Sequence, residues 1–480
     1  MTKETSIQKS VFWSGGAEIA VKLISPVTNM ILARILAPEA FGVLAICNMI
    51  ISFIDIITDA GFSKYLVQHD FSNEEEKERY ANVAFWSNLA VSFLMWGIVV
   101  LNRNQIARLL GKSEYASVIS IACMQLVFTS MVSIQMGLLR RDFMFKKLFI
   151  ARTGVALVPL IVTVPLAILT HSYWALVIGN ISGSVLNALI LVLCSKWKPS
   201  FFYSFEILKE MFSYSFWSLC EALAHWLIFW IDTFIVGQVY DSYYLGIYKN
   251  SANMIMSIMN MITAAICPVL LSIFSRIKSN KECYDIFIYI EKAVAYVLLP
   301  MGIGMYFYRS LCTSIMFGKN WGEAADIVGA WALMMTLNTL FYSFPAEIYK
   351  AKGIPKVLFF YQISYLIFLI PICVITAKIN FWTFVHARAF SVVIQIILCF
   401  IFLKKYLNWN PLTYIRDIIK PFLAAGCIVI LCIIFQQEYN SVIKDLFSIL
   451  EIIISYFVIL AIFFRKDILV SLKYISKKKI

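Results

Sequence analysis

Ionisable side chains inside long apolar stretches are the first residues in this sequence that could carry chemistry. Glu18, Lys22, Ser25 and Asn29 follow one another at steps of 4, 3 and 4 residues, which places them on one face of a helix. A charge at membrane depth costs about 2.5–3.5 kcal/mol on insertion scales, so such groups normally face a bundle interior or a water-filled cavity. The stripe therefore indicates a hydrophilic surface inside a helical bundle.

Three more apolar stretches carry polar stripes with helical spacing. They are the groups Asn48, Ser52, Asp55 and Asp59; Glu221, His225 and Asp232; and Lys249, Asn253, Ser257 and Asn260. One interpretation is a central hydrophilic cavity lined by the four helices that carry the stripes. The alternative is that pairs four residues apart, such as Glu18 with Lys22, neutralise each other and only hold helices together. Because four helices carry such stripes, the cavity is the favoured interpretation.

The composition indicates that lipid is the solvent for much of the chain. Of the 480 residues, 61% are hydrophobic and 14% are charged, whereas a soluble domain carries about 25% charged residues. The net charge is +13, but the basic residues form short clusters between apolar stretches. No nucleic acid is therefore expected as a partner.

Motifs of metal sites, disulfide frameworks and enzymes give no signal. Almost all of the 11 cysteines fall in apolar stretches, and they form no CxxC pair. No Walker A, HExxH, GxSxG or GxGxxG sequence stands in a suitable context. We expect no metal site, no catalytic residue and no cofactor.

Stretches of about 20 apolar residues, the length that crosses the hydrocarbon core, recur along the chain. We expect an all-α integral membrane protein with about fourteen transmembrane helices, at 11–35, 40–62, 81–101, 115–138, 149–169, 172–194, 210–236, 244–273, 286–308, 324–348, 356–377, 381–403, 418–435 and 446–464. With a cytoplasmic N-terminus, 29 of the 41 lysines and arginines fall in cytoplasmic segments and 8 on the opposite side. This bias satisfies the positive-inside rule, so both termini are predicted to be cytoplasmic.

An internal repeat divides the chain. The tripeptide FWS at 12–14 recurs at 216–218, an offset of 204 residues, and at the same offset FGV at 41–43 aligns with LGI at 245–247. The copies begin the expected first and seventh helices, which indicates parallel halves related by an axis along the membrane normal. We therefore predict two six-helix lobes and an appended helix pair with a basic tail, at 1–198, 199–405 and 406–480.

A basic cluster joins the expected fourth and fifth helices. Its cationic side chains are Arg140, Arg141, Lys146 and Lys147. On the cytoplasmic side, such a patch attracts anionic headgroups or a pyrophosphate. The alternative is that the cluster only fixes the orientation of the helices.

Several short motifs, in their order along the chain, resemble one family. They are ARILAPEAFG at 33–42, DAGF at 59–62, the arginine-rich turn at 138–147, YWALV at 173–177, DTFIVG at 232–237 and FGKNW at 317–321. Together they resemble the polysaccharide exporters, the Wzx-type flippases of the multidrug/oligosaccharidyl-lipid/polysaccharide superfamily. The subgroup that exports colanic acid, teichuronic acid and related polymers is the most similar. The turn at 239–244 lacks the Gly-Pro-Glu type sequence of some relatives.

The resemblance implies a flippase that moves undecaprenyl-diphosphate-linked oligosaccharide repeat units across the bacterial cytoplasmic membrane by alternating access. Membrane lipids and proteins of polysaccharide synthesis or polymerisation are the implied partners. The groups expected to hold the substrate are Lys22, Arg34, His225, Lys249, Asn29, Asn48 and Asn253. The carboxylates expected to bind a coupling proton or cation are Glu18, Asp55, Glu221 and Asp232.

Two other functions stay open at this point. A MATE-like drug/cation antiporter of the same superfamily shares the fold and differs in cargo. A membrane polysaccharide polymerase or ligase usually needs a long external loop with catalytic groups. The longest expected outside loop, at 309–323, has 15 residues, fewer than a folded domain needs.

Overall fold

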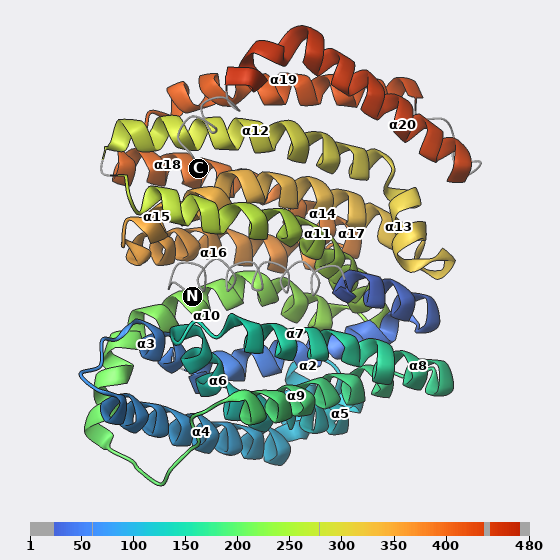
Figure 1. Cartoon of the computed structure of the whole chain (residues 1–480). Helices are drawn as coiled ribbons and strands as arrows, with labels where there is room; N and C mark the ends of the chain where they lie inside the picture. Colours follow the sequence, from blue (N-terminus) through green and yellow to red (C-terminus); the bar gives the residue numbers. More distant parts are fainter. Residues whose placement is uncertain (1–23, 60, 278, 436–441, 471–480) are drawn as a thin grey trace. The chain divides into compact units, whose positions relative to one another are not determined.

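The computed structural model describes residues 24–59, 61–277, 279–435 and 442–470, and these form helices joined by short connections (Figure 1). Twelve helical spans in this part of the chain are long and apolar enough to cross a membrane. They are Pro38–Asp59, Glu74–Leu109, Ser113–Arg141, Phe145–Thr170, Trp174–Cys194, Leu219–Val239, Asn280–Phe307, Ala324–Ala351, Lys356–Ala377, Phe381–Leu407, Pro411–Phe435 and Val442–Val470. The predicted all-α membrane architecture is confirmed.

The count of fourteen helices and the cytoplasmic location of both termini stay predictions. The first expected helix is described only over 24–35, which is helical. The eighth corresponds to α11 (Ser242–Phe274), which is not among the twelve spans. The predicted lobe boundaries at residues 198 and 405 also stay predictions.

Side-chain caps set where several helices begin. Asn73 accepts a hydrogen bond from the backbone N–H of Glu76 at 2.7 Å, and Glu76 accepts from the N–H of Ser72 at 2.6 Å. This reciprocal arrangement starts α4 (Glu74–Leu109) within the acidic stretch before the third expected span. The Ser204 side chain accepts from the N–H of Ile207 and starts α10 (Phe205–Val239).

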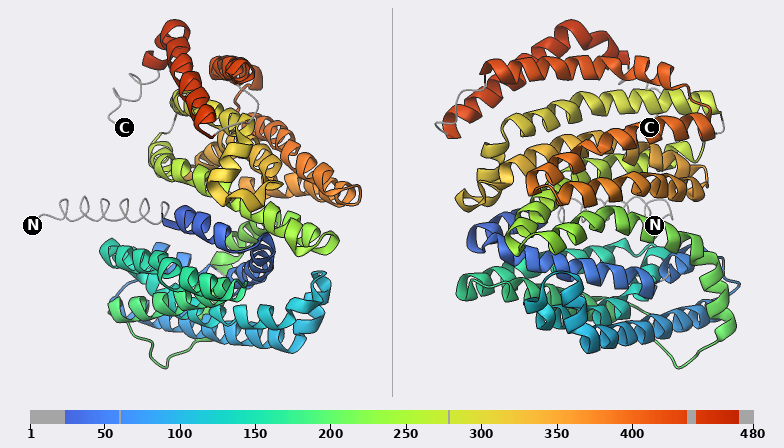
Figure 2. Two further views of the ribbon diagram at one scale, coloured as in Figure 1. Left: turned by 90° about the vertical axis from the view of Figure 1, so that its right-hand side faces the viewer. Right: turned by 180° about the vertical axis from the view of Figure 1, so that it is seen from behind.

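The first of two compact units comprises the chain up to Asn250. In it, α2 (Pro38–Asp59) leads through the short α3 (Phe62–Gln68) into α4. The helix α6 (Gln125–Arg141) packs against α3, α4 and α9 (Trp174–Cys194), α7 (Phe145–Val158) packs on α9, and α10 packs on α2. Two further views allow these helices to be followed (Figure 2). In this packing α2 contacts both α10 and α6.

The second unit begins at Ser251. There α12 (Asn280–Phe307) packs against α14 (Ala324–Asn338) and α19 (Pro411–Phe435), and α20 (Val442–Ile459) packs on α19. Buried Tyr296, Ala424 and Tyr456 belong to one hydrophobic cluster that joins these helices. The expected appended pair is therefore fastened to α12.

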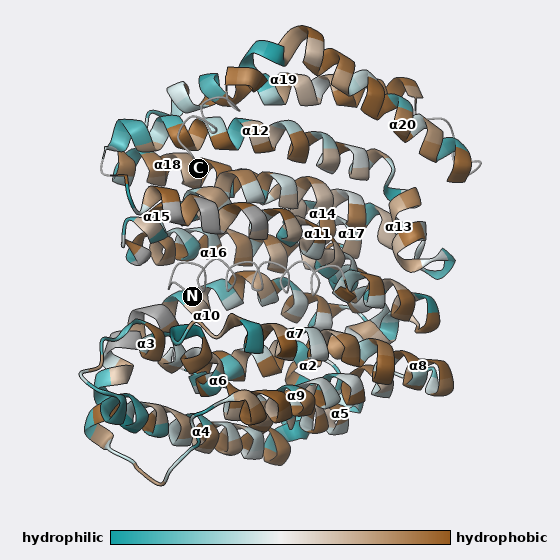
Figure 3. Cartoon of the chain, viewed as in Figure 1, coloured by the Kyte–Doolittle hydropathy of each residue, from teal (hydrophilic) through white to brown (hydrophobic). Residues whose placement is uncertain are grey.

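Large apolar side chains point away from both cores. Phe447 and Phe457 on α20 are 63% and 64% exposed. Hydrophobic residues predominate along α8 (Val164–Thr170) and α20 (Figure 3). Such continuous apolar surfaces are costly in water and are typical of helices that face lipid.

Candidate functional site

A buried carboxylate, Asp232, lies near the end of α10. It is 1% exposed. Its Oδ1 accepts hydrogen bonds from the backbone N–H and the hydroxyl of Thr233 at 2.6 and 3.2 Å, and its Oδ2 accepts from the Tyr248 hydroxyl on α11 at 2.9 Å. These donors compensate the cost of burying a charge. Asp232 thus fastens the start of α11 to the end of α10.

Lys249, the next residue on α11, is also buried. It is 2% exposed, and its Nζ donates to the carbonyl oxygen of Phe229 at 2.9 Å. The same nitrogen lies 3.9 Å from the ring centroid of Phe229 and 4.2 Å from that of Trp230. A carbonyl and two ring faces stabilise an ammonium ion away from water. An anion can therefore reach Lys249 only after its surroundings move.

An amide pair connects the helical stretch 24–35 with α11. The Nδ2 of Asn29 donates to Oδ1 of Asn250 at 3.0 Å. Asn250 is 5% exposed, and its own Nδ2 has no hydrogen-bond partner among the described residues. An unpaired buried donor costs about 1–3 kcal/mol. The pair therefore has the capacity to accommodate one more acceptor.

The stripe on α2 divides between two neighbouring helices. Ser52 accepts a hydrogen bond from the Trp226 indole N–H on α10 at 3.0 Å. Asp55 Oδ1 accepts from the Thr129 hydroxyl on α6 at 2.9 Å. Asp59 Oδ1, one turn further, accepts from the Ser133 hydroxyl at 2.6 Å. The two aspartates thus face α6.

The remaining predicted site residues are not brought into one cluster. Glu18 and Lys22 lie outside the described residues. Half-buried Asn48 and Glu221, and exposed Arg34 and His225, belong to the first unit, whereas exposed Asn253 belongs to the second. Asp232 accepts a hydrogen bond from Tyr248, which precedes Lys249 on α11, and Asn29 donates one to Asn250.

Two cations of the predicted basic patch hold the ends of helices. The Arg141 guanidinium donates to the carbonyl oxygens of Leu66 and His69 at 2.9 and 2.5 Å, at the C-terminal end of α3. Lys147 donates to the carbonyl oxygen of Cys194, which ends α9. Cations near helix C-termini satisfy carbonyl groups that lack partners within the helix. The other two cations, Arg140 and Lys146, are exposed.

A carboxylate that sequence reasoning missed lies beside α3. The hydroxyls of Tyr65 and Tyr80 each donate to one carboxylate oxygen of Glu210 at 2.7 Å. These hydrogen bonds hold the pKa of Glu210 below its ordinary value. Burial, followed by the hydrogen bond to Glu210, raises the pKa of Tyr65. His69 stacks on Tyr65 with ring centroids 4.7 Å apart.

Two buried ionisable residues of the second unit were also missed. Glu291 on α12 is 1% exposed and accepts from the Tyr414 hydroxyl on α19 at 2.6 Å. Arg388 is 5% exposed and donates to the hydroxyls of Tyr365 and Ser391 at 3.2 and 3.3 Å. In the sequence, Glu291 stands directly before Lys292, and Arg388 is a charged residue within an apolar stretch. The pattern does not reveal the partner.

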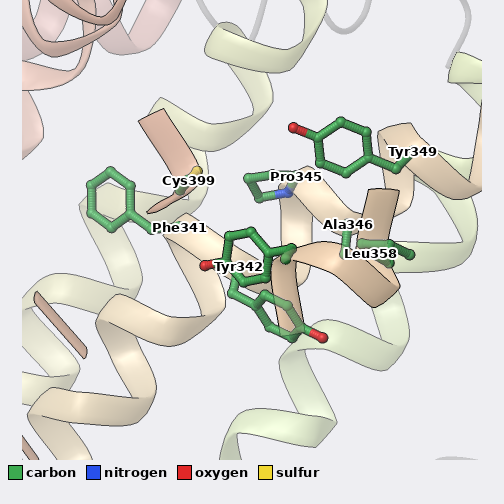
Figure 4. A pocket seen from close by; sticks show the side chains of 8 residues that line it. Phe341, Tyr342, Pro345, Ala346, Tyr349, Leu358 and Cys399 are labelled. Carbon is green, nitrogen blue, oxygen red and sulfur yellow. The ribbon is translucent and has the colours of Figure 1, made fainter. Parts of the chain in front are cut away.

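A small pocket of the second unit lies beside a π-helical turn, Thr339–Ser343, between α14 and α15 (Phe344–Ala351). Figure 4 shows its aromatic and apolar lining. The lining residues are Phe341, Tyr342, Pro345, Ala346, Tyr349, Leu358, Tyr361 and Cys399. Because this lining contains no basic side chain, the pocket does not suit a diphosphate.

Comparison with known proteins identifies the family. A family model described as "Polysaccharide biosynthesis protein" matches residues 31–326, more than half of the chain. The chain belongs to this polysaccharide biosynthesis family. It is 26% identical to the succinoglycan biosynthesis transport protein ExoT of Rhizobium meliloti, over 75% of this chain and 72% of that protein. It is 22% identical to the teichuronic acid biosynthesis protein TuaB of Bacillus subtilis, over 79% of this chain and 78% of that protein.

Solved structures show that this member of the polysaccharide biosynthesis family has a transporter fold. The lipid II flippase MurJ, in an inward closed conformation, superposes with a TM-score of 0.78 at 15% identity and covers 96% of this chain and 99% of that one. An inward-facing multidrug resistance MATE transporter of the MOP superfamily superposes with a TM-score of 0.62 at 11% identity and covers 85% and 95%. The fold expected from the resemblance is thereby confirmed.

Proposed function

We propose that this chain moves undecaprenyl-diphosphate-linked oligosaccharide repeat units across the bacterial cytoplasmic membrane for surface polysaccharide biosynthesis. Membership of the polysaccharide biosynthesis family is the observation that carries the proposal, and the flippase-like fold supports it. A glycan diphosphate cannot cross hydrocarbon because its polar groups would lose their hydrogen bonds with water. It needs a hydrated route, whereas its polyprenyl tail can stay in lipid.

The buried polar groups of the first unit supply the chemistry that such a route needs. Lys249 would contribute a cation for the diphosphate, and Asn29 and Asn250 would contribute amide groups beside it. Lys22, Arg34 and His225 are the further basic candidates from the sequence, and Asn48 and Asn253 are the further amides. These groups would be exposed in turn as the two predicted lobes rock around the pathway.

Carboxylates in the same region would couple transport to a proton or cation. Asp55 and Asp232 are the better supported pair, because each accepts hydrogen bonds from hydroxyl groups inside the first unit. A carboxylate held by hydroxyl donors can exchange a proton or bind a small cation without losing its position. Glu18 and Glu221 are the further candidates from the sequence.

Reconstitution tests the proposal directly. Purified protein in liposomes, supplied with a fluorescent undecaprenyl-diphosphate oligosaccharide, should move the lipid from one leaflet to the other. Empty liposomes and undecaprenyl phosphate without sugar are the controls. Complementation of a bacterial strain that lacks its own polysaccharide flippase should restore surface polymer. Failure of both assays with folded protein would exclude this cargo.

The alternatives predict different outcomes in the same assays. A MATE-like antiporter would raise drug resistance in cells and leave the labelled lipid in its original leaflet. A polymerase or ligase would lengthen or transfer the glycan, which chromatography of the recovered lipid would reveal. Neither alternative accounts for the family match as simply as a flippase does.

A further inference from the structure

Two glycines related by the 204-residue repeat meet where α2 and α11 begin. A Cβ atom added to Gly42 would lie closer than 3.0 Å to the carbonyl oxygen of Ser242. One added to Gly246 would lie closer than 3.0 Å to the carbonyl oxygen of Pro38. Because the atoms in the way belong to the backbone, only glycine allows this approach at either position.

The contact is symmetric in the repeat. Pro38 and Ser242 are separated by the same 204 residues as Gly42 and Gly246. The hypothetical Cβ of each glycine lies 3.2 Å from the backbone nitrogen of the other. The repeated elements thus pack on each other through equivalent backbone atoms, all of them within the first unit.

A second chain segment holds the same turn. Lys112, which is 6% exposed, donates from Nζ to the carbonyl oxygen of Tyr240 at 2.7 Å. Gln238 donates from its amide to the carbonyl oxygen of Leu109 at 2.6 Å, and the hydroxyls of Ser242 and Tyr115 lie 3.2 Å apart. The turn between α10 and α11 is therefore tied to the turn after α4.

The candidate cation lies one helical turn behind this contact. Lys249 and Asn250 follow Gly246 by three and four residues, so they lie near the same face of α11. Both are buried. Separation of the first turn of α11 from α2 would free α11 to move relative to α10 and the stretch 24–35, whose groups contact Lys249 and Asn250. The unpaired Nδ2 of Asn250 would then gain access to an acceptor.

We propose that the Gly42–Gly246 contact is the closure of the transport pathway at the end opposite the cytoplasm, and that it holds α11 where Lys249 is enclosed. This inference rests on the proposed function for its cargo and on the positive-inside prediction for its side of the membrane. The two glycines are then positioning residues: they do not bind the substrate themselves, but they set how closely α2 and α11 approach beside the substrate site. Opening requires the two backbones to part, and closing requires that neither carries a side chain.

Chemical labelling tests the closure without any cargo. The reporter is Ser242→Cys, because Ser242 is 7% exposed and its backbone carbonyl is unchanged by the substitution. A membrane-impermeant maleimide is applied to intact cells, and the protein without the reporter gives the background from the 11 native cysteines. Labelling should be slow in the reporter protein and several-fold faster after Gly42→Ala or Gly246→Ala.

Matched controls come from glycines in open surroundings. A Cβ added to Gly97 or Gly304 meets no described atom within 4 Å, so Gly97→Ala and Gly304→Ala should label like the reporter protein alone. Lys112→Met loosens the same turn without adding a clash and should also speed labelling, by a smaller factor. If the glycine variants fail to accumulate as folded protein, Lys112→Met decides the outcome.

The outcomes separate this inference from the proposed function. Unchanged labelling in folded Gly42→Ala and Gly246→Ala, or labelling only in inside-out vesicles, would overturn the closure even if the wild type flips lipid-linked oligosaccharide. Faster labelling in both variants supports the closure. If labelling is faster in both variants but the wild-type protein flips no such lipid, the closure is still supported and the proposed cargo is excluded. Lipid flipping by the variants should fall in parallel with the rise in labelling.

Discussion

The two ends of the first unit are held together by different physical means. Where α2 and α11 begin, Gly42 and Gly246 allow backbone to meet backbone, and close packing is the main contact. At the other end of α2, hydrogen bonds connect α3, α4 and α10 through Glu210 and its two tyrosines. Packing of this kind depends on volume and is indifferent to pH, whereas a carboxylate contact depends on protonation.

The difference suits the two ends to different tasks. A contact without side chains breaks without leaving a charge or a long side chain to reorganise, so it can open and close repeatedly. A carboxylate with two hydroxyl donors, supported by Arg141 on two carbonyl oxygens, would leave several polar groups unpaired if it parted. We therefore expect the Glu210 end to stay joined while the glycine end moves.

Gly246→Ala should have the largest effect on stability. Its added methyl group meets the Pro38 carbonyl oxygen, which is backbone and cannot rotate away. Overpacking of this kind costs about 3 kcal/mol, at the upper end of the usual range. Thermal unfolding in detergent should show a clear fall in Tm, and Gly304→Ala should show little change. An unchanged Tm in Gly246→Ala would mean that the two helices part easily in the resting state.

Arg141→Ala should have the next largest effect, at the opposite end. The substitution removes two charge-assisted hydrogen bonds to α3 and the contact of the guanidinium with Phe71, whose ring centroid lies 4.6 Å from Cζ. A loss of about 2 kcal/mol is expected, because Arg141 is partly exposed. Arg140→Ala is the matched control, since Arg140 is exposed and its guanidinium contacts the Met136 sulfur at 3.4 Å. Equal losses for the two variants would contradict the assigned role of Arg141.

The sequence could predict the helices because their signals are local. The expected span at 381–403 corresponds to Phe381–Leu407, and that at 172–194 to Trp174–Cys194. The repeat also placed two glycines in register, and the structure brings those glycines together. The turn at 239–244 lacks the Gly-Pro-Glu type sequence of some relatives. There, Asp241 caps α11 by accepting a hydrogen bond from the N–H of Tyr244 at 3.0 Å.

The polar contacts could not be predicted in the same way. Tyr65 and Tyr80 lie 145 and 130 residues from Glu210, and no periodic pattern relates residues so far apart. Spacing placed Lys249 on a polar stripe but gave no indication that a carbonyl and two aromatic rings enclose it. A stripe shows which side of a helix is polar, whereas the partners depend on how distant helices pack.

Acidification should have the smallest effect on stability. Of the two ends, it should weaken only the one that contains Glu210. Its pKa lies below the ordinary value of 4.5 because Tyr65 and Tyr80 donate to the carboxylate. A lowered pKa in the folded state gives stability that is present above about pH 4.5 and is lost as the pH falls through the folded pKa. Glu210 is exposed, so solvent screens its contacts, and Glu210→Gln should lower Tm at pH 7 by an amount that corresponds to only about 0.5 kcal/mol. The difference from the wild type should shrink as the pH falls below 4.5 and through the lowered pKa of folded Glu210. Because the His69 ring stacks on both tyrosines, each comparison is repeated in a His69→Gln background. Glu206→Ala, an exposed carboxylate on the same helix, should leave the pH profile unchanged. A difference between Glu210→Gln and wild type that persists undiminished at low pH would show that the contact does not depend on the charge of Glu210.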